Sequence, residues 1–204
     1  MNEMVIAAII TIITAATPLL YAALGEMITE KSGVLNLGVE GMILIGAVCG
    51  FATVHFTGSA TLAVLAGLSA GMMLSSLFAL LTLWFQASQV ASGLALTIFG
   101  IGLSALLGQS LVGVVYDGLP KLFIPGLTDI PLLGPLLFGH DILVYGSFVL
   151  TLAISWFLTR SRAGLILRAV GDSHDAAHAI GFSVLKIRLM AILFGGAMSG
   201  LRCQ

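Results

Sequence analysis

Residues 60–85 read ATLAVLAGLSAGMMLSSLFALLTLWF and contain no charged side chain. About a quarter of the residues of a soluble domain are charged, whereas this chain of 204 residues has 8% charged and 59% hydrophobic residues and a mean hydropathy of +1.14. A helix needs about 20 apolar residues to cross a bilayer. The stretch is therefore predicted to cross a membrane as a helix, and most of the protein surface is expected to face lipid.

Further apolar segments surround this one. They cover residues 4–24, 34–56, 94–115 and 142–158, and a sixth begins near Leu189. A backbone in lipid must satisfy its own hydrogen bonds, so a spanning segment is a helix or part of a closed barrel. The segments lack the alternation of period two that a barrel requires. The sequence thus predicts an all-α, polytopic transmembrane helix bundle of five to six spans, forming a single domain over residues 1–204.

Glycine pairs four residues apart lie on one face of a helix and let a neighbouring helix approach closely. Three such pairs predict tight helix packing: Gly46 and Gly50, Gly67 and Gly71, Gly196 and Gly200.

The basic residues set the expected orientation, because cytoplasmic loops are enriched in Lys and Arg. Five of the eight fall within residues 159–188, which are predicted to form a cytoplasmic loop. Counting spans back from it places the proline-rich segment 117–141 outside the cell as an extracytoplasmic loop, and the N-terminus outside as well. The count also places residues 86–93 and 25–33 inside and 55–59 outside. This assignment of loops to the two sides is wrong if any segment spans only half the membrane. The segment 34–56 is the candidate for such a half span.

Within the basic loop, DSHDAAHAIG (172–181) predicts a short helix. Ser or Asp at its start can cap the first turn, an acidic residue there suits the helix dipole, and the glycine can end the helix in the left-handed conformation. A helix with such small side chains suits insertion into a groove of another protein better than it suits catalysis. The residues expected to form this docking surface are Ser173, Asp175, Ala176, Ala177 and Gly181.

This spacing resembles the "EAA…G" loop of ABC-importer permeases, with Asp175 in place of Glu. TPLLYAALGEMITEKSGVLNLGVEGMILIGA (17–47), QVASGLALT (89–97) and RAGLILRAVGDSHDAAHAIGFSV (162–184) resemble signatures of the nucleoside and simple-sugar permeases within the branched-chain amino acid/ribose class. The resemblance runs in order along nearly the whole chain. Members of this family continue with further spans, so the chain is expected to be a C-terminally truncated permease, and Arg202 and Cys203 are atypical of the family.

The resemblance implies a transport subunit of the plasma (inner) membrane whose short loop helix is the coupling helix that docks on an ATP-binding subunit. Its other implied partners are a second homologous permease and an extracytoplasmic substrate-binding lipoprotein. A nucleoside is the first candidate substrate, with a simple sugar or a branched-chain amino acid as alternatives. The sequence has no Gly-x-x-x-x-Gly-Lys-Ser/Thr motif, so ATP would be hydrolysed by a partner and the chain is expected to bind no cofactor. No basic cluster interleaved with aromatics indicates nucleic acid.

Polar residues inside the spans are candidates for a solute path, because a charged group at mid-membrane costs at least about 2.5 kcal/mol. The candidates are Asn36, Glu40, Gln89 and Ser92. The glycines around the first two predict a broken helix that could line a path, and the alternative is that both tie helices together by hydrogen bonds. The other two belong to a polar segment, residues 86–93, which could bind solute hydroxyls or simply form a loop.

Two other readings remain open. A secondary transporter or channel would need carboxylates in mid-span, and only Glu40 and Glu26 are available; Glu26, Glu30 and Lys31 are otherwise expected at the membrane interface. His174 and His178, four residues apart on the predicted short helix, could reach one zinc ion, but the remaining ligands would be a poor set for a structural site. No metal is therefore expected.

Overall fold

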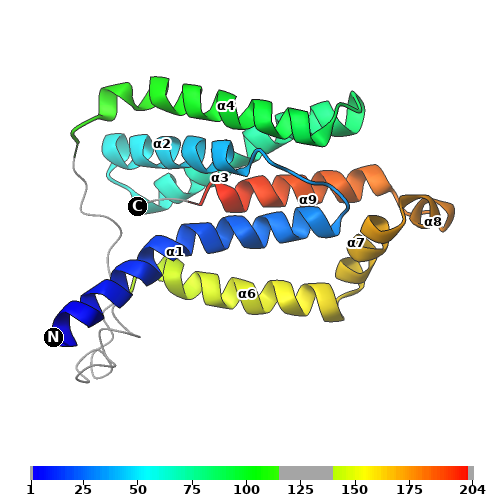
Figure 1. The fold of residues 1–204 in the computed structure, drawn as a ribbon, viewed down its shortest axis with the longest axis horizontal. Helices are drawn as coiled ribbons and strands as arrows, with labels where there is room; N and C mark the ends of the chain where they lie inside the picture. The colour runs from blue at the N-terminus through cyan, green and yellow to red at the C-terminus, as the bar shows by residue number, and fades with distance from the viewer. Residues whose placement is uncertain (1, 115–139, 202–204) are drawn as a thin grey trace.

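The computed structural model describes residues 2–114 and 140–201, and the elements assigned there are helices. The long helices lie side by side and alternate in direction (Figure 1), and α7 (Arg162–Asp172) and α8 (His174–Ala179) lie together at one end of the bundle. The long helices are α1 (Asn2–Lys31), α2 (Val39–Thr57), α3 (Ala60–Ala79), α4 (Gln89–Gly108), α6 (Ile142–Arg160) and α9 (Val184–Ser199). The predicted all-α class is confirmed.

Within the described residues, 2–114 and 140–201, five helical segments are long and apolar enough to cross a membrane. They are α1, α2, α3 with the π-helix η1 (Leu80–Trp84), α4 with the 3-10 helix η2 (Gln109–Leu111), and α6, while α9 is shorter at 16 residues. Large apolar side chains cover their outer faces, and Met73, Ile98 and Leu152 are each more than 70% exposed. A surface covered by so many large apolar side chains is favourable where the surrounding solvent is itself apolar.

Helix α9 lies in the middle of the bundle and joins its two apolar cores. Its Ile192 packs with Met42 of α2 and Phe78 of α3 in one core. Its Ala191 packs with Ile28 of α1 and Ile154 of α6 in the other. The predicted sixth segment therefore packs mainly against α1 and α3, while α4 packs on α2.

The glycines of α3 and α9 bring the backbones of the two helices into contact. A Cβ atom added to Gly71 would overlap the carbonyl oxygen of Gly196, and one added to Gly67 would overlap that of Gly200. Gly46 of α2 approaches the same place, since its Cβ would lie 2.5 Å from the Gly200 Cα. The predicted packing role of these glycines is confirmed, and any side chain here would force the helices apart.

Several predicted helix limits are wrong. Helix α1 runs to Lys31 instead of ending at residue 24, because Gly25 does not break the helix. Gly25 packs against α9 instead: a Cβ atom added to it would lie 2.9 Å from the Gly195 carbonyl oxygen. Helix α2 begins at Val39 instead of residue 34. The residues before it form a loop whose turn depends on Asn36, so the predicted broken helix is instead a loop followed by one continuous helix.

The bounds of two further segments differ from the predicted ones. Helix α4 begins at Gln89, so the predicted polar loop 86–93 is short and its second half is helical. Between α3 and α4, Gln86 takes a positive φ of 52°, which is rare for a residue with a side chain. The basic segment 159–188 holds α7 and the start of α9 in addition to the one predicted helix. The polar first turn of α4 lies outside the apolar run, which is why the apolar pattern missed it, whereas α7 is amphipathic and its helical periodicity was an available signal.

The connections alternate between the two ends of the bundle. Residues 32–38, residues 85–88 and the α7–α8 unit share one end, and the turn between α2 and α3 lies at the other (Figure 1). This alternation has the parity that the span count predicts. Nearly all of the proline-rich segment 117–141, together with Arg202 and Cys203, lies outside the described residues.

Candidate functional site

The loop between α1 and α2, residues 32–38, which we call the cavity loop, is held over residues 35–37 by side chains of α1 and α4. The backbone N–H of Leu35 donates to the Gln89 Oε1 of α4 at 2.8 Å, and that of Asn36 donates to the Glu26 Oε1 of α1 at 2.9 Å. The Thr97 hydroxyl of α4 donates to the Leu37 carbonyl at 2.8 Å. These side chains therefore satisfy backbone N–H and C=O groups of the cavity loop that have no partner within a helix or strand.

Asn36 determines the turn at the end of the cavity loop. Its side chain is 2% exposed; the amide oxygen accepts from the Gly38 N–H at 3.0 Å, and the amide nitrogen donates to the Met42 sulfur at 3.6 Å. Asn is favoured in such turns because its side chain bonds the backbone two residues on. These contacts support the alternative in which Asn36 ties the loop to α2.

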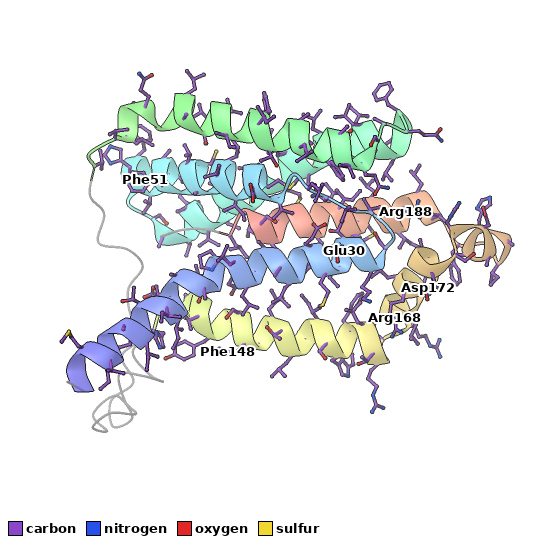
Figure 2. All side chains as sticks on the ribbon, viewed as in Figure 1. Glu30, Phe51, Phe148, Arg168, Asp172 and Arg188 are labelled. Atoms are coloured by element: carbon purple, nitrogen blue, oxygen red, sulfur yellow. The ribbon has the colours of Figure 1, made fainter. Side chains whose placement is uncertain are left out.

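An open cavity of about 380 Å³ lies beside the cavity loop, between α1 and the start of α2. Its lining includes Glu26 and Glu30 of α1, Asn36 of the loop and Glu40 of α2. Figure 2 labels Glu30 near the end of α1 that leads into the loop. Glu40 is exposed in the first turn of α2, where the helix dipole favours a carboxylate. The cavity therefore presents hydrogen-bond acceptors in an otherwise apolar lining.

The two carboxylate oxygens of Glu26 differ in their hydrogen bonding. One oxygen accepts from Asn36, and the other is buried with no hydrogen-bond partner among the described residues. The sequence placed this residue at the membrane interface and missed its contact with the loop. Its position four residues before Glu30 on one helix face was the available signal.

Of the two predicted path residues of α4, Gln89 supports the cavity loop, and neither Gln89 nor Ser92 is among the residues that line the cavity. Gln89 holds Leu35, and Ser92 is 8% exposed in the first turns of the helix. Next to it, a Cβ added to Gly93 would lie 2.8 Å from the Leu37 backbone nitrogen. The structure thus places Asn36 and Glu40 at the cavity and Gln89 against the cavity loop, whereas Ser92 is buried and does not line the cavity.

The predicted short helix, α8, has the local structure that its sequence indicates. The Ser173 hydroxyl accepts from the Ala176 N–H at 3.4 Å, a long hydrogen bond at the helix start. Gly181 has a φ of +96°, and its N–H donates to the His178 carbonyl at 2.9 Å. The helix therefore begins and ends at the predicted residues.

The predicted docking residues divide between the two faces of α8. Ser173, Asp175, Ala176 and Gly181 are exposed, whereas Ala177 is 3% exposed and packs inward. Ile180 is 75% exposed at the tip, a large apolar side chain that the sequence analysis did not single out. The sequence feature that could have indicated Ile180 is its position next to Gly181, as a large apolar residue in a segment whose other residues are polar or small. An Asp175 carboxylate oxygen lies 3.4 Å from His174 Nε2, and a contact between side chains this exposed contributes little stability.

Titratable residues do not gather into a metal centre in the part of the chain that the structure describes. No group of three or more His, Cys, Asp or Glu side chains there could hold a metal ion. His174 and His178 are both exposed on α8, which suits contact with solvent or with a partner protein.

The helix bundle, with large apolar side chains on its outer surface, defines a multi-pass membrane protein. It carries an open cavity lined in part by carboxylates and a short exposed helix, α8. Residues 8–202 match the family described as the branched-chain amino acid transport system / permease component, and the chain belongs to that family. As a member of this permease family with several helices long enough to cross a bilayer, it is a multi-pass protein of the plasma membrane.

Curated relatives are similar over nearly the whole chain. A Haloferax volcanii protein provisionally named as a glucose ABC transporter permease, TsgC13, is 38% identical over 92% of this chain and 58% of its own length. The guanosine ABC transporter permease protein NupQ of Bacillus subtilis is 36% identical, and the nucleoside ABC transporter permease protein NupC of Lactococcus lactis is 30% identical, each over 91% of this chain and 62% of its own length. The chain thus spans about 60% of these relatives. No solved structure matches.

Proposed function

We propose that the chain is the membrane-spanning subunit of an ABC importer and that it carries a nucleoside across the plasma membrane. The observation that carries this proposal is α8, a capped and exposed helix of small side chains that projects from one end of the bundle (Figure 1). Such a helix presents a compact surface to a partner protein, and the permease family supplies the class of that partner. ATP binding and hydrolysis would then belong to a separate subunit docked on α8.

The distribution of charge supports a cytoplasmic position for α8. All of the described Lys and Arg residues lie at the α7–α8 end of the bundle, among them Arg168 and Arg188 (Figure 2). No described Lys or Arg lies at the opposite end. The positive-inside rule assigns the basic end to the cytoplasm, where an ATP-binding subunit would meet α8, while a substrate-binding lipoprotein would approach the opposite end.

The cavity supports a small polar solute. Its volume of about 380 Å³ falls within the range of small-molecule sites, about 300–1,000 Å³. Carboxylates are hydrogen-bond acceptors, so Glu26 and Glu40 would suit the hydroxyl groups of a ribose or a hexose. Two of the relatives are named for nucleosides or guanosine, which favours a nucleoside, and TsgC13, named for glucose, makes a simple sugar the second candidate.

The docking role of α8 is tested by Ile180→Asp in the full transporter. The side chain is exposed and lies outside both apolar cores, so the folded permease should persist in the membrane. We expect the ATP-binding subunit to be lost in a pull-down, because a charged side chain buried at an interface without a partner costs at least about 2 kcal/mol. Ile180→Leu is the matched control and should retain the subunit. Full retention by the aspartate variant would reject this docking surface.

The substrate is tested by uptake in membrane vesicles that contain the assembled transporter and ATP. Labelled guanosine, uridine, glucose and leucine are offered separately, and a nucleoside is expected to accumulate. Accumulation of glucose or leucine alone would replace the nucleoside proposal with the corresponding alternative. Uptake that proceeds equally without the ATP-binding subunit would instead favour the secondary-transporter class.

A further inference from the structure

Helix α7 touches the start of the cavity loop through two glycines. Gly33 has a φ of +81°, and a Cβ added to it would lie 3.2 Å from the Gly171 Cα. A Cβ added to Gly171 would overlap the carbonyl oxygen of Lys31. The backbone of α7 therefore lies directly against the end of α1, with no side chain between them that could absorb a displacement.

Arg188 reaches the same point from the other side. It stands in the second turn of α9, just after α8, and its Nε donates to the Ser32 carbonyl at 3.2 Å. Its side chain also closes the space beside Gly33, where an added Cβ would lie 3.1 Å from an Nη atom. Carbonyls at a helix C-terminus lack partners within the helix and carry the negative end of the dipole. A half-buried guanidinium is a strong donor at such a position.

The other end of the cavity loop forms the cavity wall. Leu35 and Asn36 follow Gly33 closely in sequence, line the cavity, and have their backbone N–H groups fixed by Gln89 and Glu26. A shift of residues 32–33 must therefore either break these hydrogen bonds or carry the cavity lining with it. The loop is short and held at both ends, so it can pass a displacement on.

We propose that the Gly33–Gly171 contact and the Arg188–Ser32 hydrogen bond form the link through which a movement of α7 and α8 reaches the cavity. Arg188 is a positioning residue in this link: it keeps the cavity loop attached to the α8 side of the bundle when α8 is displaced. The proposal rests on the proposed docking of an ATP-binding subunit on α8. It adds the route by which docking and ATP binding would change the shape of the cavity.

The test follows the cavity loop directly and needs no transported solute. Leu35→Cys, in a background carrying Cys49→Ser and Cys203→Ser, places one thiol on the loop, where the native side chain is 40% exposed. The assembled transporter is labelled with a maleimide with and without ATP. Without further substitution, ATP should change the labelling rate. Adding Arg188→Gln should reduce this change at least tenfold, because it removes a charge-assisted hydrogen bond, while ATP hydrolysis and retention of the ATP-binding subunit stay within twofold.

Two control variants distinguish a link from a general defect. Arg188→Lys keeps a cation near Ser32 and should restore part of the ATP-dependent change. Gly102→Ala, where an added Cβ meets nothing within 4 Å, should leave it unaltered. A full ATP-dependent change in Arg188→Gln, or none in the transporter with native Arg188, overturns the link. Loss of the ATP-binding subunit or of hydrolysis in Arg188→Gln also overturns it, since Arg188 would then act in docking or folding. Whether the ATP-binding subunit docks on α8 at all is measured separately, with the Ile180→Asp and Ile180→Leu variants.

Discussion

The α3–α9 interface and the cavity loop both bring backbone close to backbone, and they do so by different means. At the interface, Gly67 and Gly71 face Gly196 and Gly200, so two regular helices touch without side chains between them. The cavity loop is neither helix nor strand, and side chains of Glu26, Gln89 and Thr97, together with Arg188 of α9, form hydrogen bonds with its backbone. The first region satisfies its polar groups within each helix, whereas the second depends on other elements.

This difference has a mechanical consequence. A glycine interface holds because van der Waals contacts cover a large area, so it changes little unless the helices separate. A loop fixed by a few directional hydrogen bonds can exchange them one at a time. The interface is therefore suited to be the rigid part of the protein, and the cavity loop is suited to move during transport.

The largest effect is expected from Gly71→Val. The added side chain would overlap the Gly196 carbonyl, and overpacking of this kind costs about 3 kcal/mol or more where backbone must move. We expect the variant to aggregate on extraction or to lose much of its thermal stability in detergent, followed by fluorescence-detected size exclusion. Gly102→Ala on α4 has open space and should match the native protein. Equal stability of the two variants would show that the interface is not rigid.

An intermediate effect is expected from Asn36→Ala in the cavity loop. The change leaves the Gly38 N–H without its acceptor, and an unsatisfied buried donor costs about 1–3 kcal/mol. Because the helices themselves are unaffected, we expect a moderate loss of thermal stability together with faster proteolysis within residues 32–38. Leu35→Ala, at an exposed neighbouring position, is the control for stability. A loss as large as that of Gly71→Val would place the loop in the rigid part of the protein.

The smallest effect is expected from Ser173→Ala at the start of α8. Removal of a capping hydroxyl costs about 1 kcal/mol, and the long distance of 3.4 Å to Ala176 places this cap among the weaker ones. Overall thermal stability should stay the same, while amide exchange in residues 174–179 should become a few times faster. Ser161→Ala is an informative comparison, because that residue caps α7 with a hydrogen bond of 2.9 Å and should have the larger effect. The reverse order would mean that α8 is held by its cap more than by the packing of Ala177.

The sequence predicted the features that depend on local or compositional physics. Uninterrupted apolar runs identified the spans, glycine spacing identified the close interface, and the Ser173 and Gly181 signals placed both ends of α8. It failed where polar residues continue a helix. Gln89 and Ser92 belong to α4, and residues 26–31 belong to α1, because these residues tolerate the helical conformation. Glu26 and Gln89 also accept hydrogen bonds from the cavity loop.

The sequence by itself determined that this protein is an all-α membrane bundle. Unpaired backbone groups cost so much free energy in lipid that long apolar runs of this kind form helices. It also determined where the exposed short helix lies, since capping acts between residues close in the chain. Only the tertiary structure decided that Arg188 bonds the end of α1, that Glu26 holds the cavity loop, and that Ala177 packs inward. These contacts join residues distant in sequence, or choose one face of a helix over another, and no local pattern specifies which surfaces will meet.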